Sequence, residues 1–113
     1  MNVQSFTNNN IKIVRISGEV NFENYNKFRD DLLKHITGER PKILLDMEEL
    51  SYLNSMGLSA ILKAYSKAKK EKGELRLCRL QSHIKKLFSI TKLNEVIIIY
   101  DGLEEAIKEF TKK

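Results

Sequence analysis

The strongest constraint on the fold is the alternation of two hydrophobic periods along the chain. Apolar residues in short unbroken runs or at every second position predict strands, and apolar residues three and four apart predict helices. The strand-like segments are residues 3–7, 11–16, 43–46, 75–79 and 96–100. The expected inner faces of four helices are Phe22, Tyr25, Phe28, Leu32 and Ile36; Leu58, Ile61, Leu62, Tyr65 and Ala68; Ile84, Leu87 and Phe88; and Leu103, Ala106, Ile107 and Phe110. This alternation predicts an α/β fold.

Turn residues and element order predict how these strands pair. The polar turn at residues 8–10 joins the first two strand-like segments and predicts an antiparallel hairpin. Strand-helix-strand units with right-handed crossovers then predict parallel pairing. We therefore expect an N-terminal antiparallel hairpin followed by repeated strand-helix units, in a mostly parallel sheet of four or five strands with about four helices. Alternating polar residues, as in Leu75-Arg76-Leu77, predict that one sheet face is less covered than in a doubly wound fold.

Residues favoured at helix ends predict where the helices start and stop. Ser55 and Ser82 are expected to cap the second and third helices, because a hydroxyl accepts from the free amides of a first turn. Asp101 and Glu104 have the spacing of a capping box for the last helix. Gly73 follows a lysine-rich last turn of the second helix, where cations complement the helix dipole. Part of the positive charge of the chain is therefore explained by the helix ends.

Length and composition predict one domain, residues 1–113, of ordinary globular character. The chain has 113 residues, of which 42% are hydrophobic and 31% charged, in the range of folded domains and outside that of disordered chains. Cys78 is the single cysteine, which excludes an internal disulfide framework and a multi-cysteine zinc site. No apolar run approaches the roughly 20 residues that span a bilayer, and the first residues lack signal-peptide features. We expect a cytoplasmic protein without membrane insertion.

The net charge of +5, from 20 Lys and Arg against 15 Asp and Glu, raises nucleic acid as a partner. The basic residues lie mainly on predicted helix faces and are not interleaved with aromatic residues, so we expect solvated surface and no direct nucleic-acid binding. Neither a glycine-rich phosphate loop nor a set of metal ligands at motif spacing is present in the sequence. We expect no cofactor, no metal, no catalytic residues and a protein that is not an enzyme.

Ligands and partners of open parallel sheets gather at the carboxyl ends of the strands. The corresponding loop at residues 46–55 leads into the second predicted helix, and Ser55 lies at the junction. One interpretation of Ser55 is only a helix cap. The other is a phosphorylation site, because a helix N-terminus accommodates a phosphate without unfolding the domain. From the residues alone both interpretations stay open.

Two stretches resemble STAS domains, specifically bacterial anti-sigma factor antagonists. LLDMEELSYLNSMGLSAIL (residues 44–62) resembles the family signature, an apolar strand ending in Asp, a short loop, and Asp-Ser-Ser/Thr-Gly-Leu opening a helix. ISGEVNFENYNKF (residues 16–28) resembles the Gly-Glu-Leu-Asp segment of the same family. The order of elements agrees from about residue 11 to residue 110.

The resemblance implies a partner switch. In such antagonists the unmodified protein binds an anti-sigma factor that is also a serine kinase, phosphorylation breaks the complex, and a serine phosphatase restores it. The phosphorylated serine corresponds to Ser55. The implied partner-binding residues are Glu19, Asn21, Asn54, Met56, Gly57 and Leu58.

Two departures from the family pattern keep alternatives open. Asn54 and Asn21 stand where the family has aspartates, and an amide accepts hydrogen bonds but does not act as a base. The chain is then either a phosphorylated switch or an unphosphorylated STAS scaffold in a stressosome-type or lipid-transport assembly. A small enzyme using Asp46 and Glu19 is a weaker alternative. Asp46 also resembles the phosphorylated aspartate of response-regulator receivers, but Glu19 alone does not supply the acid pair that magnesium requires there.

Overall fold

The fold opens with the predicted hairpin. In the computed structural model, which describes residues 1–112, β1 (Asn2–Asn8) pairs antiparallel with β2 (Ile11–Val20) over seven consecutive residue pairs. Asn9 and Asn10 connect the strands with φ of 54° and 66°. Asparagine tolerates this left-handed backbone better than most residues, which is why a two-residue asparagine turn closes the hairpin here.

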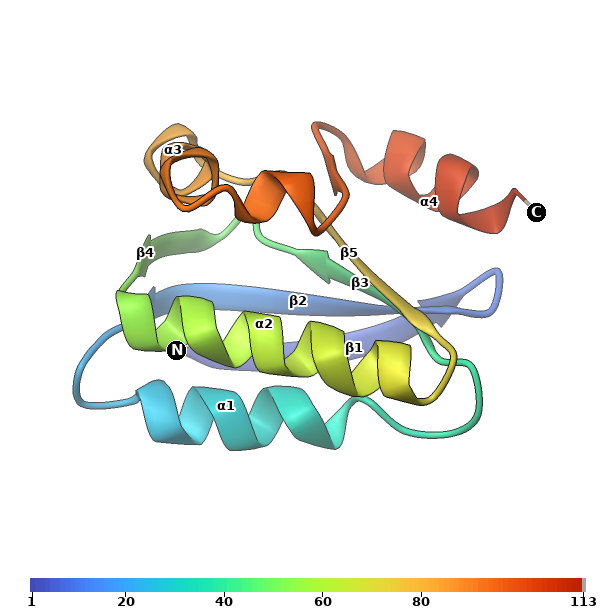
Figure 1. The fold of residues 1–113 in the computed structure, drawn as a ribbon, viewed down its shortest axis with the longest axis horizontal. Coiled ribbons are helices and arrows are strands. Elements are labelled where there is room, and N and C mark those ends of the chain that lie inside the picture. The colour runs from blue at the N-terminus through green and yellow to red at the C-terminus, as the bar shows by residue number, and fades with distance from the viewer. Residues whose placement is uncertain (113) are drawn as a thin grey trace.

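The rest of the chain alternates strands and helices around one sheet (Figure 1). The further elements are α1 (Tyr25–Lys34), β3 (Lys42–Asp46), β4 (Leu50–Leu53), α2 (Ser55–Lys70), β5 (Glu74–Cys78), α3 (Ser82–Ile90), a 3-10 turn η1 (Leu93–Glu95), β6 (Ile99–Tyr100) and α4 (Leu103–Thr111). The strand order is β1-β2-β3-β5-β6, and β4 pairs with the second half of β2. All pairs except β1–β2 are parallel, as predicted.

The two faces of the sheet are covered unequally. The larger core lies between the sheet and α1, α2 and α3, and includes Val14, Ile16, Phe28, Leu45, Ile61, Leu77 and Phe88. The smaller core lies under α4 and consists of Ile11, Ile13, Leu44, Cys78, Ala106 and Phe110. Figure 1 shows α1 and α2 side by side on one face and α4 over one end of the other. The prediction of one less-covered face is confirmed.

The predicted fold class is confirmed, with six strands in place of four or five. β4 lies inside the segment that was predicted to be a loop. Its apolar residues Leu50 and Leu53 are three apart and both buried, so the segment shows no strand-like alternation. β2 continues through Gly18 to Val20, whereas the predicted strand ended at residue 16. β6 is shorter than predicted, because residues 96–98 form an irregular turn after η1 and are not part of the strand.

Helix faces and caps differ from the predictions in particular residues. Phe22 lies outside α1 and is 80% exposed, and Leu62 is exposed on α2. Ser55 and Ser82 are the first residues of their helices and not the caps, which are Asn54 and Gln81. The cap of α4 is Gly102, and it has no side-chain hydrogen bond, so the predicted Asp101–Glu104 capping box does not form. Among residues 1–112, no helix is both long enough and apolar enough to cross a bilayer.

Candidate functional site

The site at Ser55 is built by the ends of β2 and β4 and the start of α2. β4 runs parallel to the last residues of β2, after a register shift between Gly18 and Glu19. The backbone N–H of Asn54 donates to the carbonyl oxygen of Val20 at 3.1 Å. This bond holds the entry of α2 against the carboxyl end of β2. The connection between β2 and α1 therefore lies at the same end of the molecule as Ser55 (Figure 1).

Asn54 caps α2 and leaves the hydroxyl of Ser55 free. The side-chain oxygen of Asn54 accepts a 2.8 Å hydrogen bond from the backbone N–H of Gly57. Ser55 follows as the first helical residue and is exposed. Its hydroxyl makes no hydrogen bond to any other residue in the described range 1–112. The result is an unengaged nucleophile at a helix N-terminus, where free amides and the helix dipole favour anions.

Asn21 is used in the turn that precedes α1. Its side-chain oxygen accepts from the backbone N–H groups of Glu23 and Asn24, at 2.9 and 3.1 Å. The side-chain oxygen of Asn24 accepts a hydrogen bond from the backbone N–H of Asn21 at 2.9 Å. The side-chain amide of Asn24 donates to the carbonyl oxygen of Glu19. Asn21 and Asn54 both act through an acceptor oxygen, which an aspartate supplies equally well. The local structure is therefore kept without either negative charge.

Gly57 and Leu58 lie beneath the exposed surface. Leu58 belongs to the larger core, and Gly57 is buried against β2 and β4. A Cβ atom on Gly57 would lie 2.5 Å from Leu53 Cδ1 and 2.7 Å from Val20 Cγ1. Gly57 therefore allows the first turn of α2 to pack directly on the two strands.

Three large apolar side chains are exposed around this end. Phe22 is 80% exposed, Tyr52 47% and Met56 45%. The rings of Phe22 and Tyr25 lie 6.2 Å apart, so Phe22 stands at the start of α1. A groove of about 190 Å³ continues from Met56 between the two helices, lined by Tyr25, Arg29, Met56, Ser59, Ala60 and Lys63. Apolar side chains left in water beside a helix N-terminus are typical of a protein-binding surface.

Comparison with known protein families gives a match along almost the whole chain. The family model of the STAS domain matches residues 2–106. The chain belongs to the STAS domain family. Among its relatives, the anti-sigma-B factor antagonist of Bacillus subtilis is 28% identical over 99 residues, which cover 88% of this chain and 90% of that protein.

Solved structures show the same fold. An anti-sigma factor antagonist from Mycobacterium paratuberculosis superposes with a TM-score of 0.88 at 18% identity, covering 98% of this STAS domain and 94% of that chain. The Bacillus cell fate determinant SpoIIAA in its phosphorylated form superposes with a TM-score of 0.69 at 19% identity, covering 96% of this chain and 98% of that one.

In this STAS domain the sequence-predicted site residues divide into exposed and buried sets. Glu19, Ser55 and Met56 are exposed, Asn21 and Asn54 are partly exposed, and Gly57 and Leu58 are buried. Sequence reasoning missed Phe22 and Tyr52 as surface residues. Phe22 fits the helical spacing that continues through Tyr25, and Tyr52 lies in the unrecognised β4. The sequence does offer one indication that Phe22 is exposed: it directly follows Asn21, and asparagine favours turns.

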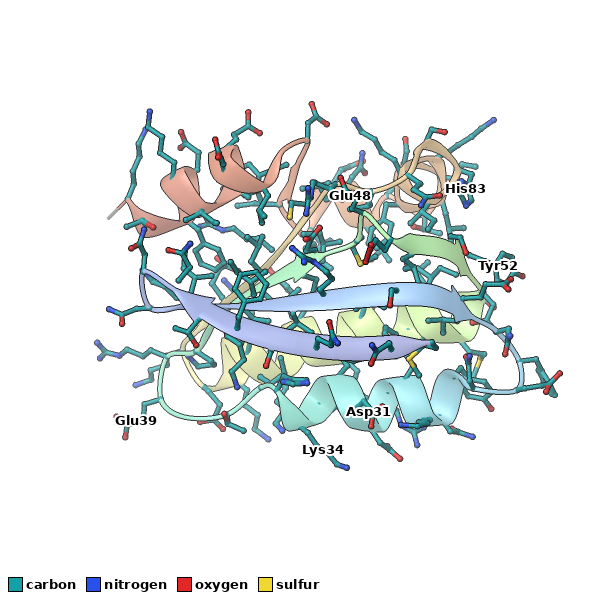
Figure 2. All side chains as sticks on the ribbon, turned by 180° about the vertical axis from the view of Figure 1, so that it is seen from behind. Asp31, Lys34, Glu39, Glu48, Tyr52 and His83 are labelled. Carbon is teal, nitrogen blue, oxygen red and sulfur yellow. The ribbon has the colours of Figure 1, made fainter. Side chains whose placement is uncertain are left out.

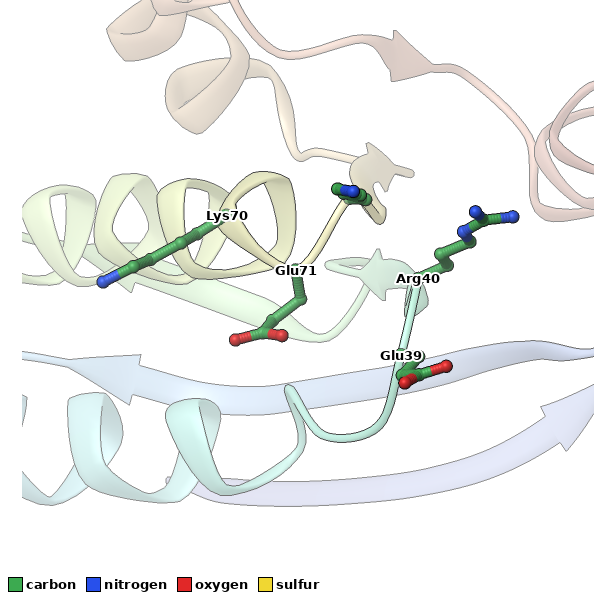
Figure 3. Close-up of a pocket in the computed structure, with 5 residues that line it drawn as sticks. Glu39, Arg40, Lys70 and Glu71 are labelled. Carbon is green, nitrogen blue, oxygen red and sulfur yellow. The ribbon is translucent and has the colours of Figure 1, made fainter.

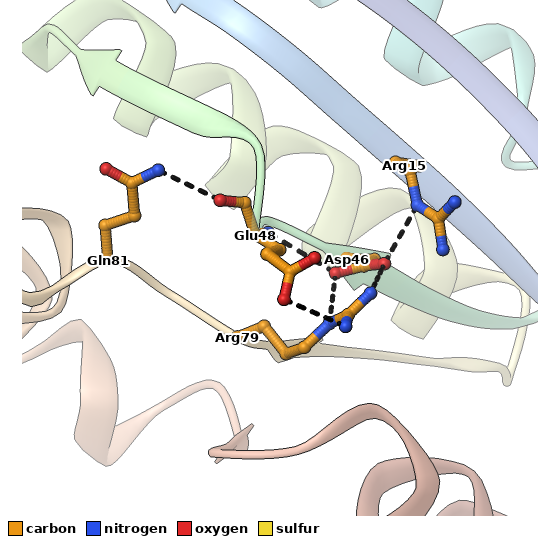
Figure 4. A network of polar contacts seen from close by, with 5 residues as sticks. All are labelled: Arg15, Asp46, Glu48, Arg79 and Gln81. Carbon is orange, nitrogen blue, oxygen red and sulfur yellow. Dashed lines mark hydrogen bonds and ion pairs between the residues drawn. The ribbon is translucent and has the colours of Figure 1, made fainter.

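A polar network anchors the strand that delivers Ser55 (Figure 4). Asp46, at the end of β3, is fully buried and accepts from Arg15 Nε at 3.0 Å. It also accepts from Arg79 Nε at 3.0 Å and from Arg79 Nη2 at 2.6 Å. Burial raises the pKa of Asp46, but the hydrogen bonds from Arg79 and Arg15 lower it more, so the pKa lies below its usual range. Asp46 is a structural ion-pair partner and stays ionised.

The same network continues to α3 and holds β4 from two sides. Arg79 also pairs with Glu48 at 3.0 Å, and Gln81 donates to the carbonyl oxygen of Glu48 at 2.9 Å. His83 Nε2 lies 2.6 Å from the carbonyl oxygen of Ser51, and the Ser51 hydroxyl donates to Gly18 on β2. Glu48 and His83 are labelled beside Tyr52 in Figure 2. β4 is thus fixed between β2 and α3.

Two other features do not contribute to this site. Burial raises the pKa of the Cys78 thiol to about 12, so the thiol stays protonated. A hollow at the far end of α2 is lined by Glu39, Arg40, Lys70, Glu71 and Lys72, with charges of both signs (Figure 3). Within residues 1–112, no group of three His, Cys, Asp or Glu side chains is placed to hold a metal ion.

Proposed function

We propose that this STAS domain is an anti-sigma factor antagonist that acts by partner switching. In its unmodified state it binds an anti-sigma factor of the serine-kinase type, and phosphorylation of Ser55 releases it. The observation that carries the proposal is the free, exposed hydroxyl of Ser55 at the first residue of α2. The relative named an anti-sigma-B factor antagonist and the likeness to a phosphorylated SpoIIAA structure support it. The proposal places the protein in the cytoplasm, where sigma factors act.

The partner surface in this proposal combines apolar groups, neutral polar groups and one acidic side chain. Phe22, Tyr52 and Met56 supply apolar area, and Glu19, Asn21 and Asn54 surround Ser55 with polar groups. Gly57 and Leu58 act from below by setting the height and position of the first turn of α2. Buried aromatic anchors with a polar rim are the usual arrangement of an energetically strong interface.

A phosphate on Ser55 changes this surface without disturbing the fold. It adds about 1.5 to 2 negative charges, and the free amides at the start of α2 accommodate them in the isolated domain. Inside an apolar interface the same dianion loses its hydration and is repelled by any acidic neighbour. A 100-fold loss of affinity requires about 2.8 kcal/mol, which desolvating a dianion readily supplies.

The two amides determine where the chemistry of phosphorylation must come from. Asn21 and Asn54 do not accept a proton from the Ser55 hydroxyl, because a neutral amide is not a base at physiological pH. In this proposal the kinase supplies the general base. A serine phosphatase that restores the unmodified state likewise supplies its own catalytic groups. The proposal thus assigns all catalytic groups to the partners and only the acceptor hydroxyl to this chain.

Incubation with ATP and a purified serine-kinase anti-sigma factor from the same genome is expected to add one phosphate to the intact protein. Ser55→Ala is expected to abolish the mass shift, whereas Ser59→Ala, one helical turn further on the same exposed face of α2, is expected to leave it unchanged. Intact-mass spectrometry measures both. A phosphate retained in Ser55→Ala, or lost only in Ser59→Ala, removes Ser55 from the switch.

Phe22→Ala is expected to weaken binding of the unphosphorylated protein to the same anti-sigma factor by at least about tenfold, as truncation of an aromatic anchor does. Ile90→Ala is the matched control, because Ile90 is 69% exposed but lies at the end of α3. It is expected to leave the affinity within about twofold, as for a residue outside an interface. Isothermal titration calorimetry measures both affinities. Equal losses in the two variants would place the interface elsewhere.

The absence of carboxylates at Asn21 and Asn54 favours one second candidate, a STAS scaffold that binds without being phosphorylated, in a stressosome-type or lipid-transport assembly. Capture of partners by the purified protein from its native cells separates the two candidates. An ATPase-fold anti-sigma factor supports the switch. Membrane transporter subunits or other STAS proteins, together with an unphosphorylated Ser55, support the scaffold.

A further inference from the structure

The edge strand β1 lacks the features that normally prevent strands from pairing between molecules. It lies at one end of the strand order, and its outer edge has no partner strand within residues 1–112. Residues 1–10, MNVQSFTNNN, include no charged side chain and no proline. The seven pairs with β2 are consecutive, without a bulge. Proteins usually protect exposed edges with charges, prolines or bulges, and a long regular edge without them is an association site.

The turn of the hairpin determines which backbone groups of β1 face outward. Asn8 and Ile11 flank the two-residue turn, so they form the first hydrogen-bonded pair of the ladder. Hydrogen-bonded and non-bonded pairs alternate from there, so Phe6, Gln4 and Asn2 bond to β2. The N–H and C=O groups of Val3, Ser5 and Thr7 therefore point away from the sheet. They form a row along an edge about 24 Å long, at about 3.4 Å per residue.

We propose that β1 pairs antiparallel with β1 of a second copy of this chain, joining two sheets across a two-fold axis at Ser5. In this register Ser5 faces its own copy, Val3 faces Thr7, and all three outward-facing residues form hydrogen-bonded pairs of two bonds each. Asn2 faces Asn8, and Gln4 faces Phe6. An isologous contact of this kind closes after two copies.

Charge opposes a second copy less along β1 than over the rest of the surface. Each copy carries a net charge of +5, so two copies repel over most of their surfaces. Residues 2–10 carry no charged side chain, so like-charged copies can approach along this strand without side-chain charges facing each other. Beside the edge, Lys27, Asp31 and Lys34 of α1 line a hollow together with Val3 (Figure 2). Asp31 pairs with Lys27 at 2.7 Å, which leaves one lysine charge there in each copy. On the other face, pairing covers Phe6, which is 43% exposed.

Sedimentation equilibrium of the purified protein over a wide concentration range tests this pairing. The wild type is expected to rise from one to two times the monomer mass with increasing concentration. Ser5→Pro removes only an N–H group that points outward, and an edge strand tolerates proline at such a position. Ser5→Lys places two like charges opposite each other in the proposed pair. Both are expected to remain monomers. Asn94→Lys adds the same charge on exposed η1 and is expected to dimerise like the wild type.

Thermal unfolding of each variant by circular dichroism shows that the monomers are folded. A wild type that stays monomeric up to about 1 mM, an affinity limit of about 4 kcal/mol, overturns the proposal and leaves the edge to a strand of a different protein. Dimerisation of both Ser5 variants equal to that of the wild type also overturns it, because the dimer then uses another surface. Neither result depends on phosphorylation of Ser55.

Discussion

Asp46→Asn is expected to lower the free energy of unfolding by about 2–4 kcal/mol at neutral pH, because it removes the charge from a fully buried ion-pair partner. Asparagine keeps the shape of the side chain but accepts fewer and weaker hydrogen bonds. Arg15 and Arg79 then lose their shared carboxylate, and the middle of β2 loses its polar connection to the ends of β3 and β5. Urea denaturation of both proteins measures the difference.

Asp101→Asn is the matched control for this substitution. Asp101 pairs with Lys85 at the same 3.0 Å, but its side chain is 87% exposed. Exposed ion pairs contribute little, so a loss below about 1 kcal/mol is expected. Similar losses in the two variants would contradict the assigned role of the buried carboxylate.

The difference between the wild type and Asp46→Asn is also expected to depend on pH. The pKa of Asp46 is lowered in the folded protein relative to the ordinary value of 3.8. The ionised carboxylate therefore stabilises the fold fully above pH 3.8, and this stabilisation disappears as the pH falls through the lowered value. The loss in the variant is expected to be constant around neutral pH and to diminish in acid. A difference that is unchanged below pH 3.8 would contradict the ion-pair explanation.

Gly57→Ala is expected to destabilise the protein by about 1–3 kcal/mol, the usual cost of adding a methyl group to a filled core. The new Cβ would meet Leu53 and Val20 at 2.5 and 2.7 Å, and both side chains are themselves buried. Relief requires the first turn of α2 to move away from β2 and β4. Ser55 moves with that turn, so binding of the anti-sigma factor is expected to weaken as well.

Gly102→Ala provides the control for Gly57→Ala. At Gly102 the nearest atom to a Cβ is Glu105 Cβ at 4.0 Å, and φ is −117°, which any residue adopts. A change below about 1 kcal/mol is expected, since the substitution affects only the preference at a helix cap. Urea denaturation of both variants gives the comparison. Equal destabilisation would show that contact with Leu53 and Val20 is not the cause.

The sequence predicted the fold because most elements have clear periods, and it failed where a boundary depends on contacts between distant segments. Asn54 and Ser55 are both favoured helix caps. The hydrogen bond from Asn54 to Val20 places Asn54 at the cap, and that bond depends on β4 pairing with β2. A four-residue strand with leucines at both ends has no alternation to detect, so the sequence alone does not distinguish the two caps.

The sequence predicted which segments lie together around Ser55 and predicted less well which of their side chains are exposed. The motif correctly located the Ser55 loop beside the end of β2, because motif spacing fixes chain position. Exposure depends on packing, and Gly57 and Leu58 proved to be buried while Phe22 proved to be exposed. Phe22 fits a helical spacing that the backbone does not follow, because the side chains of Asn21 and Asn24 form a turn there first.

The neutral amides at Asn21 and Asn54 also affect how the proposed switch responds to ionic strength. Neither contributes charge beside Ser55, so among the proposed partner-binding residues only the carboxylate of Glu19 is available for salt to screen in the unmodified complex. After phosphorylation the phosphate is the principal charge beside the α2 N-terminus, and screening then acts mainly on the phosphate. Changes in ionic strength therefore alter the contrast between the two states more than the affinity of the unmodified state.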